Sequence, residues 1–158
     1  MKKILDTYIN LLSLSEKTVV PVQVCYDDDE EKCYPEAEIK LTYNDIQYKG
    51  KGTDFLWTDA FADLQTKLPD GVKLACCMTC RHGNMCPFGN QANLLFCTKD
   101  LHISNVNDVC SVFDSYEEHE KREVSSFACC DDFVYQSDDY YTYSDFWCLL
   151  KEKQYIEY

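Results

Sequence analysis

A cluster of cysteines between Cys76 and Cys110 is the feature that most constrains how this chain folds. It holds six of the 11 cysteines in a chain of 158 residues, with the spacing Cys-Cys-x2-Cys-x5-Cys-x10-Cys-x12-Cys. Its tightest part, Cys77-Met78-Thr79-Cys80, is a turn that can present two sulfur atoms to one side. A tetrahedral metal ion requires that arrangement from two of its four ligands. The sequence therefore predicts a metal-binding knuckle centred on Cys77 and Cys80.

The candidate metal ligands all come from this cluster. Cys77, Cys80 and Cys97 are the favoured three, and the fourth ligand is left open between Cys86 and Cys110. The pair Cys129-Cys130 competes for that fourth place if the chain folds back on itself. His82 adjoins the knuckle and is an alternative ligand, although a surface or supporting position is the simpler interpretation for a histidine there.

The charges around the cluster also indicate thiolate chemistry. The window from Gly71 to Lys99 contains no Asp or Glu, although the chain has 28 of them. It does contain three cations and a histidine: Lys73, Arg81, Lys99 and His82. Four thiolates around a divalent ion leave a net negative charge, which nearby cations offset. The same cations lower the pKa of a thiol, so the pattern does not separate metal ligation from redox chemistry.

Zinc is the favoured metal, with three alternatives left open. An iron–sulfur cluster also uses cysteine-rich loops with a Cys-Pro step, as at Cys86-Pro87. A redox dithiol and free structural thiols are the others. A second C-x2-C at the spacing of a zinc ribbon is missing. Disulfide pairing of every cysteine is impossible because 11 is odd, and we expect a cytoplasmic protein with reduced thiols because no export signal is evident.

The composition limits the partners that we expect. Fifteen Lys and Arg against 28 Asp and Glu give a net charge of −13. Such a charge repels nucleic-acid phosphates and anionic membranes, so we expect neither as a partner. An acidic surface suits a basic protein partner, or it serves only solubility, which is the simpler interpretation. The 12 Tyr, 8 Phe and 2 Trp residues argue for a folded chain, because disordered chains are poor in aromatics.

The hydrophobic pattern predicts a single α+β domain over residues 1–158, with a Cys-rich subregion at about 76–110. Residues 1–15 have apolar positions near one face of an amphipathic helix. Residues 18–52 read as a meander of three strands, with an acidic turn after Tyr26 and a tight connection at Asn44-Asp45. Residues 54–68 form the clearest helix, which Asp54 can cap and which Pro69-Asp70-Gly71 ends.

The rest of the chain contributes shorter elements. The segments VKLACC and LLFCT read as strands, EEHEKRE as a helix and SSFACCDDFVY as a strand. The C-terminal segment from Ser144 reads as a helix or a strand. We therefore expect a small antiparallel sheet packed by two or three helices, with a Cys-rich metal-binding knuckle that holds the middle loop. A long loop in a compact domain needs such a tether.

One stretch, GKGTDFLWTDAFADLQTKLPDGVKLACCMTCRHGNMCPFG, resembles a family of small Cys-rich bacterial proteins. The shared features are a helix ending in Leu-Pro, a Cys-x2-Cys-Arg-x-Gly-Asn turn from Cys77, a Pro-x-Gly step at Pro87, and a later cysteine, Cys97. A segment like YTYSDF near the C-terminus also fits, so the resemblance covers about two-thirds of the chain. It implies a shared domain type, and it carries no known activity or mechanism.

Three functions fit these residues. The first is a non-enzymatic binding or inhibitor-type module that is stabilised by a metal ion and whose tyrosines near Asp138 to Tyr143 contact a basic partner. The second is a redox or electron-transfer protein that uses the cysteine cluster. The third is an enzyme whose nucleophile is the thiolate of Cys80 or Cys86, activated by Arg81 and His82. The first is favoured.

Overall fold

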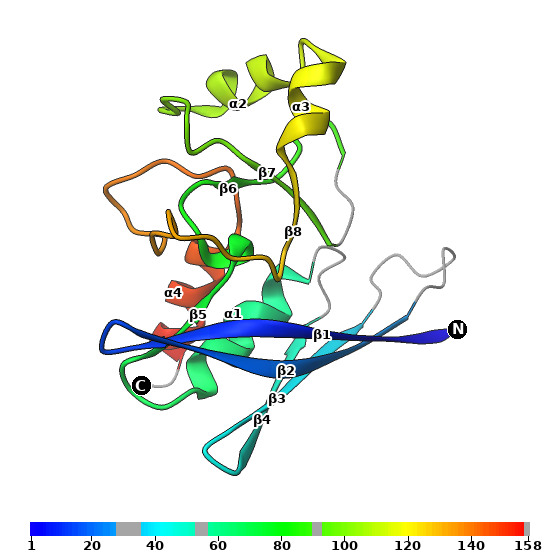
Figure 1. The fold of residues 1–158 in the computed structure, drawn as a ribbon, viewed down its shortest axis with the longest axis vertical. Helices are drawn as coiled ribbons and strands as arrows, with labels where there is room; N and C mark the ends of the chain where they lie inside the picture. Colours follow the sequence, from blue (N-terminus) through cyan, green and yellow to red (C-terminus); the bar gives the residue numbers. More distant parts are fainter. Residues whose placement is uncertain (28–35, 53–56, 90–92, 157–158) are drawn as a thin grey trace.

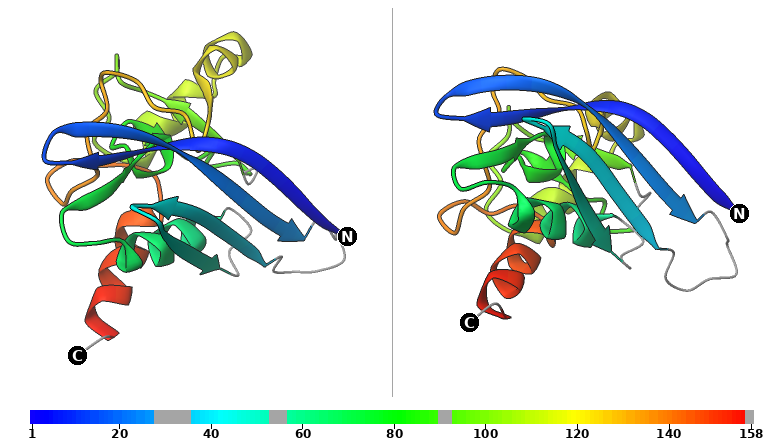
Figure 2. Two further views of the ribbon diagram at one scale, coloured as in Figure 1. Left: turned by 60° about the horizontal axis from the view of Figure 1, so that its bottom comes forward. Right: turned by 90° about the horizontal axis from the view of Figure 1, so that it is seen from below.

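The computed structural model describes residues 1–27, 36–52, 57–89 and 93–156, and it has the predicted α+β architecture. Its main sheet has five antiparallel strands in the order β4-β3-β2-β1-β5 (Figure 1). Their bounds are β1 (Lys2–Ser13), β2 (Glu16–Asp27), β3 (Ala37–Tyr43), β4 (Ile46–Gly52) and β5 (Val72–Ala75). The sheet curls around the helices that cover one of its faces (Figure 2).

The prediction of an N-terminal helix is wrong, because residues 2–13 form β1 and pair with β2 along their whole length. The apolar residues of this segment also recur at every second position, so that Leu5, Ile9 and Leu11 point to the core. Local periodicity cannot choose between the two patterns. Pairing with β2 along the whole segment selects the strand. In the turn that joins the two strands, Leu14 and Ser15 both have positive φ angles, as two-residue hairpin turns require.

The predicted meander is confirmed by β2, β3 and β4. Ala37, Ile39 and Leu41 are buried on one face of β3, as their alternation indicated. Asn44 and Asp45 form the connection from β3 to β4, and both have positive φ angles. The predicted acidic turn from Asp27 to Lys32 lies outside the described residues after Asp27.

The predicted central helix is confirmed as α1 (Thr58–Lys67), which packs against β3 and β4. Its apolar stripe belongs to the core, with the buried residues Trp57, Ala60, Phe61, Leu64 and Leu68. The proposed cap, Asp54, lies outside the described residues. The C-terminal helix is confirmed as α4 (Phe146–Ile156), and it packs against α1 on the same side of the sheet (Figure 2).

A second, smaller layer carries the cysteine cluster. It contains the short helix η1 (Cys77–Thr79) and a three-stranded sheet of β6 (Gly83–Asn84), β7 (Leu94–Cys97) and β8 (Glu123–Ser125). Two further helices, α2 (Val106–Val112) and α3 (Tyr116–Arg122), lie at the end of the molecule away from the main sheet (Figure 1). In the described residues, no helix is long and apolar enough to cross a membrane.

Three of the elements predicted for this layer are confirmed, and one is wrong over most of its length. The strands in VKLACC and LLFCT are β5 and β7, and the charged helix is α3, so these three are confirmed. The strand predicted over SSFACCDDFVY is wrong beyond Ser125, because the segment turns repeatedly and forms only one bridge, between Cys80 and Tyr135. The segment bonds instead to the cysteine turn, whose Cys77 and Arg81 amides donate to the carbonyls of Ala128 and Val134.

Candidate functional site

The turn that carries Cys77 and Cys80 is folded tightly by its own backbone. The Cys80 amide donates to the Cys77 carbonyl at 3.3 Å, and the Gly83 amide donates to the Cys80 carbonyl at 3.0 Å. A Cβ atom at Gly83 would lie 2.1 Å from the Cys77 carbonyl oxygen, so only glycine fits there. The two turns together bring Cys77 and Cys80 to the wall of one cavity.

The segment from Ser126 to Gln136 folds back over this turn. The Cys77 amide donates to the Ala128 carbonyl at 2.7 Å, and the Arg81 amide donates to the Val134 carbonyl at 2.8 Å. The Gln136 side chain is buried and its Nε2 donates to the carbonyls of Met78 and Cys80, at 3.0 and 3.3 Å. These bonds place Cys129 and Cys130 at the same cavity.

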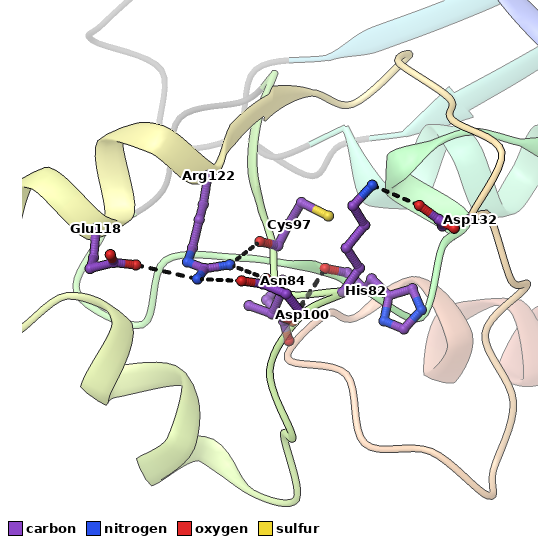
Figure 3. A network of polar contacts seen from close by, with 9 residues as sticks. His82, Asn84, Cys97, Asp100, Glu118, Arg122 and Asp132 are labelled. Atoms are coloured by element: carbon purple, nitrogen blue, oxygen red, sulfur yellow. Dashed lines mark hydrogen bonds and ion pairs between the residues drawn. The ribbon is translucent and has the colours of Figure 1, made fainter.

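A third segment, the end of β7, brings Cys97 to the cavity. Cys97 lies opposite Gly83 in the pairing of β6 with β7, and the Thr98 amide donates to the His82 carbonyl at 3.0 Å. The Arg122 guanidinium donates to the Cys97 carbonyl and to the carboxylates of Asp100 and Glu118 (Figure 3). This network fixes the backbone of Cys97 from the side of α3.

Five cysteines from these three segments therefore line one small cavity of about 20 Å³. They are Cys77, Cys80, Cys97, Cys129 and Cys130, and the other lining residues are His82, Gly83, Lys99 and Phe133. A cavity needs roughly 10–15 Å³ to hold one water molecule. The space thus suits a single water-sized species, such as one metal ion.

The structure separates the five ligands predicted from the sequence into two groups. Cys77, Cys80 and Cys97 line the cavity together, whereas Cys86 and Cys110 do not line it. Cys110 lies on α2, and Cys86 follows β6. Among the described residues, no three His, Cys, Asp or Glu side chains are already arranged as metal ligands. The metal-binding part of the predicted fold is therefore not shown, while its α+β part is.

Burial favours the protonated form of three of the cavity thiols in the absence of a metal. Desolvation raises the pKa of Cys77, Cys80 and Cys129 above the ordinary value for cysteine. Negative charge on Cys97 and Cys130 raises the pKa of Cys77 and Cys80 further, which indicates that these four groups are close. Hydrogen bonds from the backbones of Val134 and His82 act in the opposite direction on Cys80.

The cations that the sequence placed near the cluster are largely engaged elsewhere. Lys99 lines the cavity, but its Nζ lies 2.7 Å from Asp132, which the returning segment supplies. Arg81 lies over the Tyr140 ring at 4.5 Å, and Lys73 lies over the Tyr135 ring at 4.8 Å. Burial therefore outweighs these cations in setting the pKa of Cys77 and Cys80.

His82 is the other titratable residue at the cavity. It is 9% exposed, and its ring packs edge-on against Tyr140. Its Nδ1 is buried and has no hydrogen-bond partner in the described part of the chain. Burial, and next the charge of Arg81, lower its pKa and favour the neutral imidazole. A neutral imidazole can ligate a metal, so His82 stays an alternative ligand.

The sequence predicted Cys129 and Cys130 only as competitors for the place of the fourth ligand, on the condition that the chain folds back on itself. The structure meets that condition, and the signal in the sequence was the adjacent pair of cysteines itself.

No protein-family model, curated protein or solved structure shows significant similarity to this chain.

Proposed function

We propose that this chain is a zinc-stabilised binding module, with zinc held by Cys77, Cys80, Cys97 and Cys130. The observation that carries the proposal is the convergence of cysteines from three separate segments on one cavity of ionic size. Cys130 is the chosen fourth ligand because its charge affects the pKa of both Cys77 and Cys80.

Zinc suits this site better than the alternatives. Four thiolates in a tetrahedron form a common structural zinc site, which leaves no open coordination position. A cavity of about 20 Å³ suits one ion better than an iron–sulfur cluster of several atoms. The raised pKa of Cys80 also disfavours Cys80 as the nucleophile of a thiolate enzyme, since a nucleophile needs a lowered thiol pKa.

The bound metal would join the returning segment to the sheet. Cys77 and Cys80 follow β5, Cys97 ends β7, and Cys130 lies in the loop after β8. On binding, each thiol releases its proton to solvent as the zinc–sulfur bond forms. The free energy of binding then contributes to folding, because the unfolded chain has no preformed site.

Metal analysis of protein purified under reducing conditions, without added metal, tests this proposal. We expect one zinc per chain and a colourless solution. The Cys80→Ser variant should lose the zinc, while Cys148→Ser, a substitution at an exposed cysteine on α4, should keep it. Iron with visible absorption would favour the cluster alternative. Wild-type protein that contains no zinc and binds none on titration would contradict the proposal.

Variants at the remaining cysteines test the ligand set. Cys86→Ser and Cys110→Ser should retain zinc, because neither residue lines the cavity. Cys130→Ser should lose it, and Cys129→Ser should not. If Cys129→Ser or His82→Ala alone abolishes zinc binding, the fourth ligand is assigned incorrectly.

The partner that the charge distribution favours is a basic protein. Residues 100–145 carry twelve acidic residues and only two basic ones, and so account for most of the net charge of −13. Within this stretch, α3 presents exposed Glu117 and Glu120, next to Tyr116, whose side chain is exposed. The tyrosines between Asp138 and Tyr143 are half-buried, so they are less available to a partner than the sequence indicated.

A labelled lysine- and arginine-rich peptide provides a probe for this role. Its affinity should fall as salt rises, because the attraction is between exposed charges. The double variant Glu117→Gln/Glu120→Gln should bind more weakly, and Glu16→Gln at the start of β2 should not. Equal binding by all three proteins, or binding that does not depend on salt, would contradict the role.

A further inference from the structure

One edge of the main sheet is covered along only a third of its length. β1 pairs with β2 from Lys2 to Ser13, but β5 pairs with β1 only from Asn10 to Ser13. Along Lys2–Ile9, no element of the described chain forms backbone hydrogen bonds to the other side of β1. Such an edge presents unpaired N–H and C=O groups that can bind another strand.

The register identifies which backbone groups face this edge. The Asp27 amide donates to the Glu36 carbonyl, so the odd-numbered residues of β2 bond toward β3 and the even-numbered ones toward β1. In β1, the odd-numbered residues lie opposite the even-numbered residues of β2 and form hydrogen bonds with them. The N–H and C=O groups of the even-numbered residues therefore point outward from the sheet edge: Lys2, Ile4, Asp6 and Tyr8.

The side chains of these same residues lie on the outer face of the sheet. Ile4 is 62% exposed and Tyr8 is 66% exposed, so two large apolar side chains of this strand lie in water. Lys2 and Asp6 have opposite charges and flank Ile4 symmetrically. The edge therefore has an apolar centre between a cation and an anion, and such a pattern is complementary to itself when it is reversed.

We propose that a second copy of this chain adds its β1 to this edge, antiparallel and about a two-fold axis through Ile4. In that register Ile4 lies opposite Ile4 of the other copy, and Lys2 lies opposite Asp6 on each side of the axis. Each of these opposing pairs exchanges two backbone hydrogen bonds. The opposite charges meet directly across the strands, where such pairs are stabilising. The two main sheets then form one continuous sheet.

The shape and charge of the molecule are compatible with this dimer. β5 covers the far end of β1 (Figure 1). In an antiparallel pair the two β5 strands would therefore lie at opposite ends of the joint and would not meet. Most of the negative charge lies in residues 100–145, whereas the first half of β1 contains two lysines and one aspartate. This half of the strand therefore does not share the negative charge of residues 100–145, which reduces the repulsion between two copies at this edge.

Sedimentation analysis of the full chain across a range of concentrations tests the dimer, with circular dichroism to verify folding. The wild type should be in equilibrium between monomer and dimer. Lys2→Glu and Asp6→Lys should each raise the dissociation constant at least about ten-fold, because each places like charges opposite one another. The double variant Lys2→Glu/Asp6→Lys should restore an affinity close to that of the wild type, since it reverses the pairs and keeps them opposite.

Lys49→Glu is the matched control, because it makes the same charge change on β4, which is the other edge of the sheet. It should leave the dissociation constant unchanged. A wild type that stays monomeric at all concentrations would overturn the proposal, as would a dimer that Lys49→Glu disrupts. A dimer weakened by both single variants but not restored by the double variant would overturn the register. None of these measurements depends on the metal.

Discussion

Gly83 allows the chain to turn tightly around the cysteine pair, because it has no Cβ atom. Replacing it with alanine places a Cβ atom 2.1 Å from the Cys77 carbonyl oxygen, and this backbone atom cannot move without opening the turn. We expect Gly83→Ala to lower the free energy of unfolding by about 1–3 kcal/mol, the usual range for overpacking, and to reduce zinc content. Calorimetry and metal analysis measure the two effects.

Gly71→Ala is the matched control for that prediction. Gly71 has a φ of +80° but no atom within 4 Å of the added Cβ. Gly71→Ala should lower the free energy of unfolding by about 1 kcal/mol through backbone conformation alone. The zinc content should stay at the wild-type value. Equal loss of zinc from the two variants would mean that general destabilisation, and not the geometry of the turn, releases the metal.

Gln136 joins the returning segment to the cysteine turn through its side-chain amide. Gln136→Leu leaves the carbonyls of Met78 and Cys80 without this donor, which should cost about 1–3 kcal/mol. Gln136→Glu should cost more at neutral pH, because an anionic oxygen then faces two carbonyl oxygens. Denaturation at pH 7 and near pH 4 checks this. The difference in the free energy of unfolding between the two variants should become smaller at the lower pH, because the new carboxylate is then protonated. A gap that does not change with pH would contradict this account.

At the scale of the elements, the turn between β1 and β2 is chemically unsuited to its conformation. Leu14 is almost fully exposed, and both it and Ser15 have positive φ angles that side chains with a Cβ adopt at a cost. Leu14→Asn/Ser15→Gly provides the residues that this turn favours. We expect the double variant to gain about 1 kcal/mol in the free energy of unfolding.

The turn between β3 and β4 provides the reverse experiment. Asn44 and Asp45 have the same pair of positive φ angles and already suit the turn. Asn44→Leu should therefore lose about as much stability as Leu14→Asn/Ser15→Gly gains. Denaturant titration of both variants measures the difference, and a stabilising Asn44→Leu would show that turn conformation does not determine these effects.

At the scale of the whole molecule, buried thiols make the metal-free protein sensitive to alkaline pH. Cys76 is fully buried, and desolvation raises its pKa from 9.0 to about 12. Between these values the unfolded chain loses the proton while the folded chain keeps it, so stability falls as pH rises. The stabilising effect is complete below pH 9 and is lost as pH rises toward 12.

Denaturation of the metal-free protein between pH 7 and 10.5 measures this dependence. Stability should decline above about pH 9, the ordinary pKa of the unfolded thiols. Cys76→Ala should show a shallower decline, and Cys148→Ser, at an exposed thiol, should match the wild type. A steeper decline for Cys76→Ala would contradict the burial of a neutral thiol.

The sequence by itself determined the elements whose local pattern allows one interpretation. The alternation in β3 and the helical stripe from Trp57 to Leu68 each match one period, and their burial follows that pattern. The Cys77-x2-Cys80 spacing likewise determined which turn would carry two of the thiols. Local chemistry was enough in these places because neighbouring residues make the contacts that matter.

Only the tertiary structure decided the N-terminal strand and the full set of cysteines at the cavity. The segment of Leu5, Ile9 and Leu11 fits both periods, and pairing with β2 selects the strand. Cys130 reaches the cavity because residues far along the chain bond to the cysteine turn, as Gln136 does to Met78 across 58 positions. Such contacts depend on how the whole chain packs, so spacing in the sequence pointed to Cys86 and Cys110 while the fold brought Cys129 and Cys130 to the cavity.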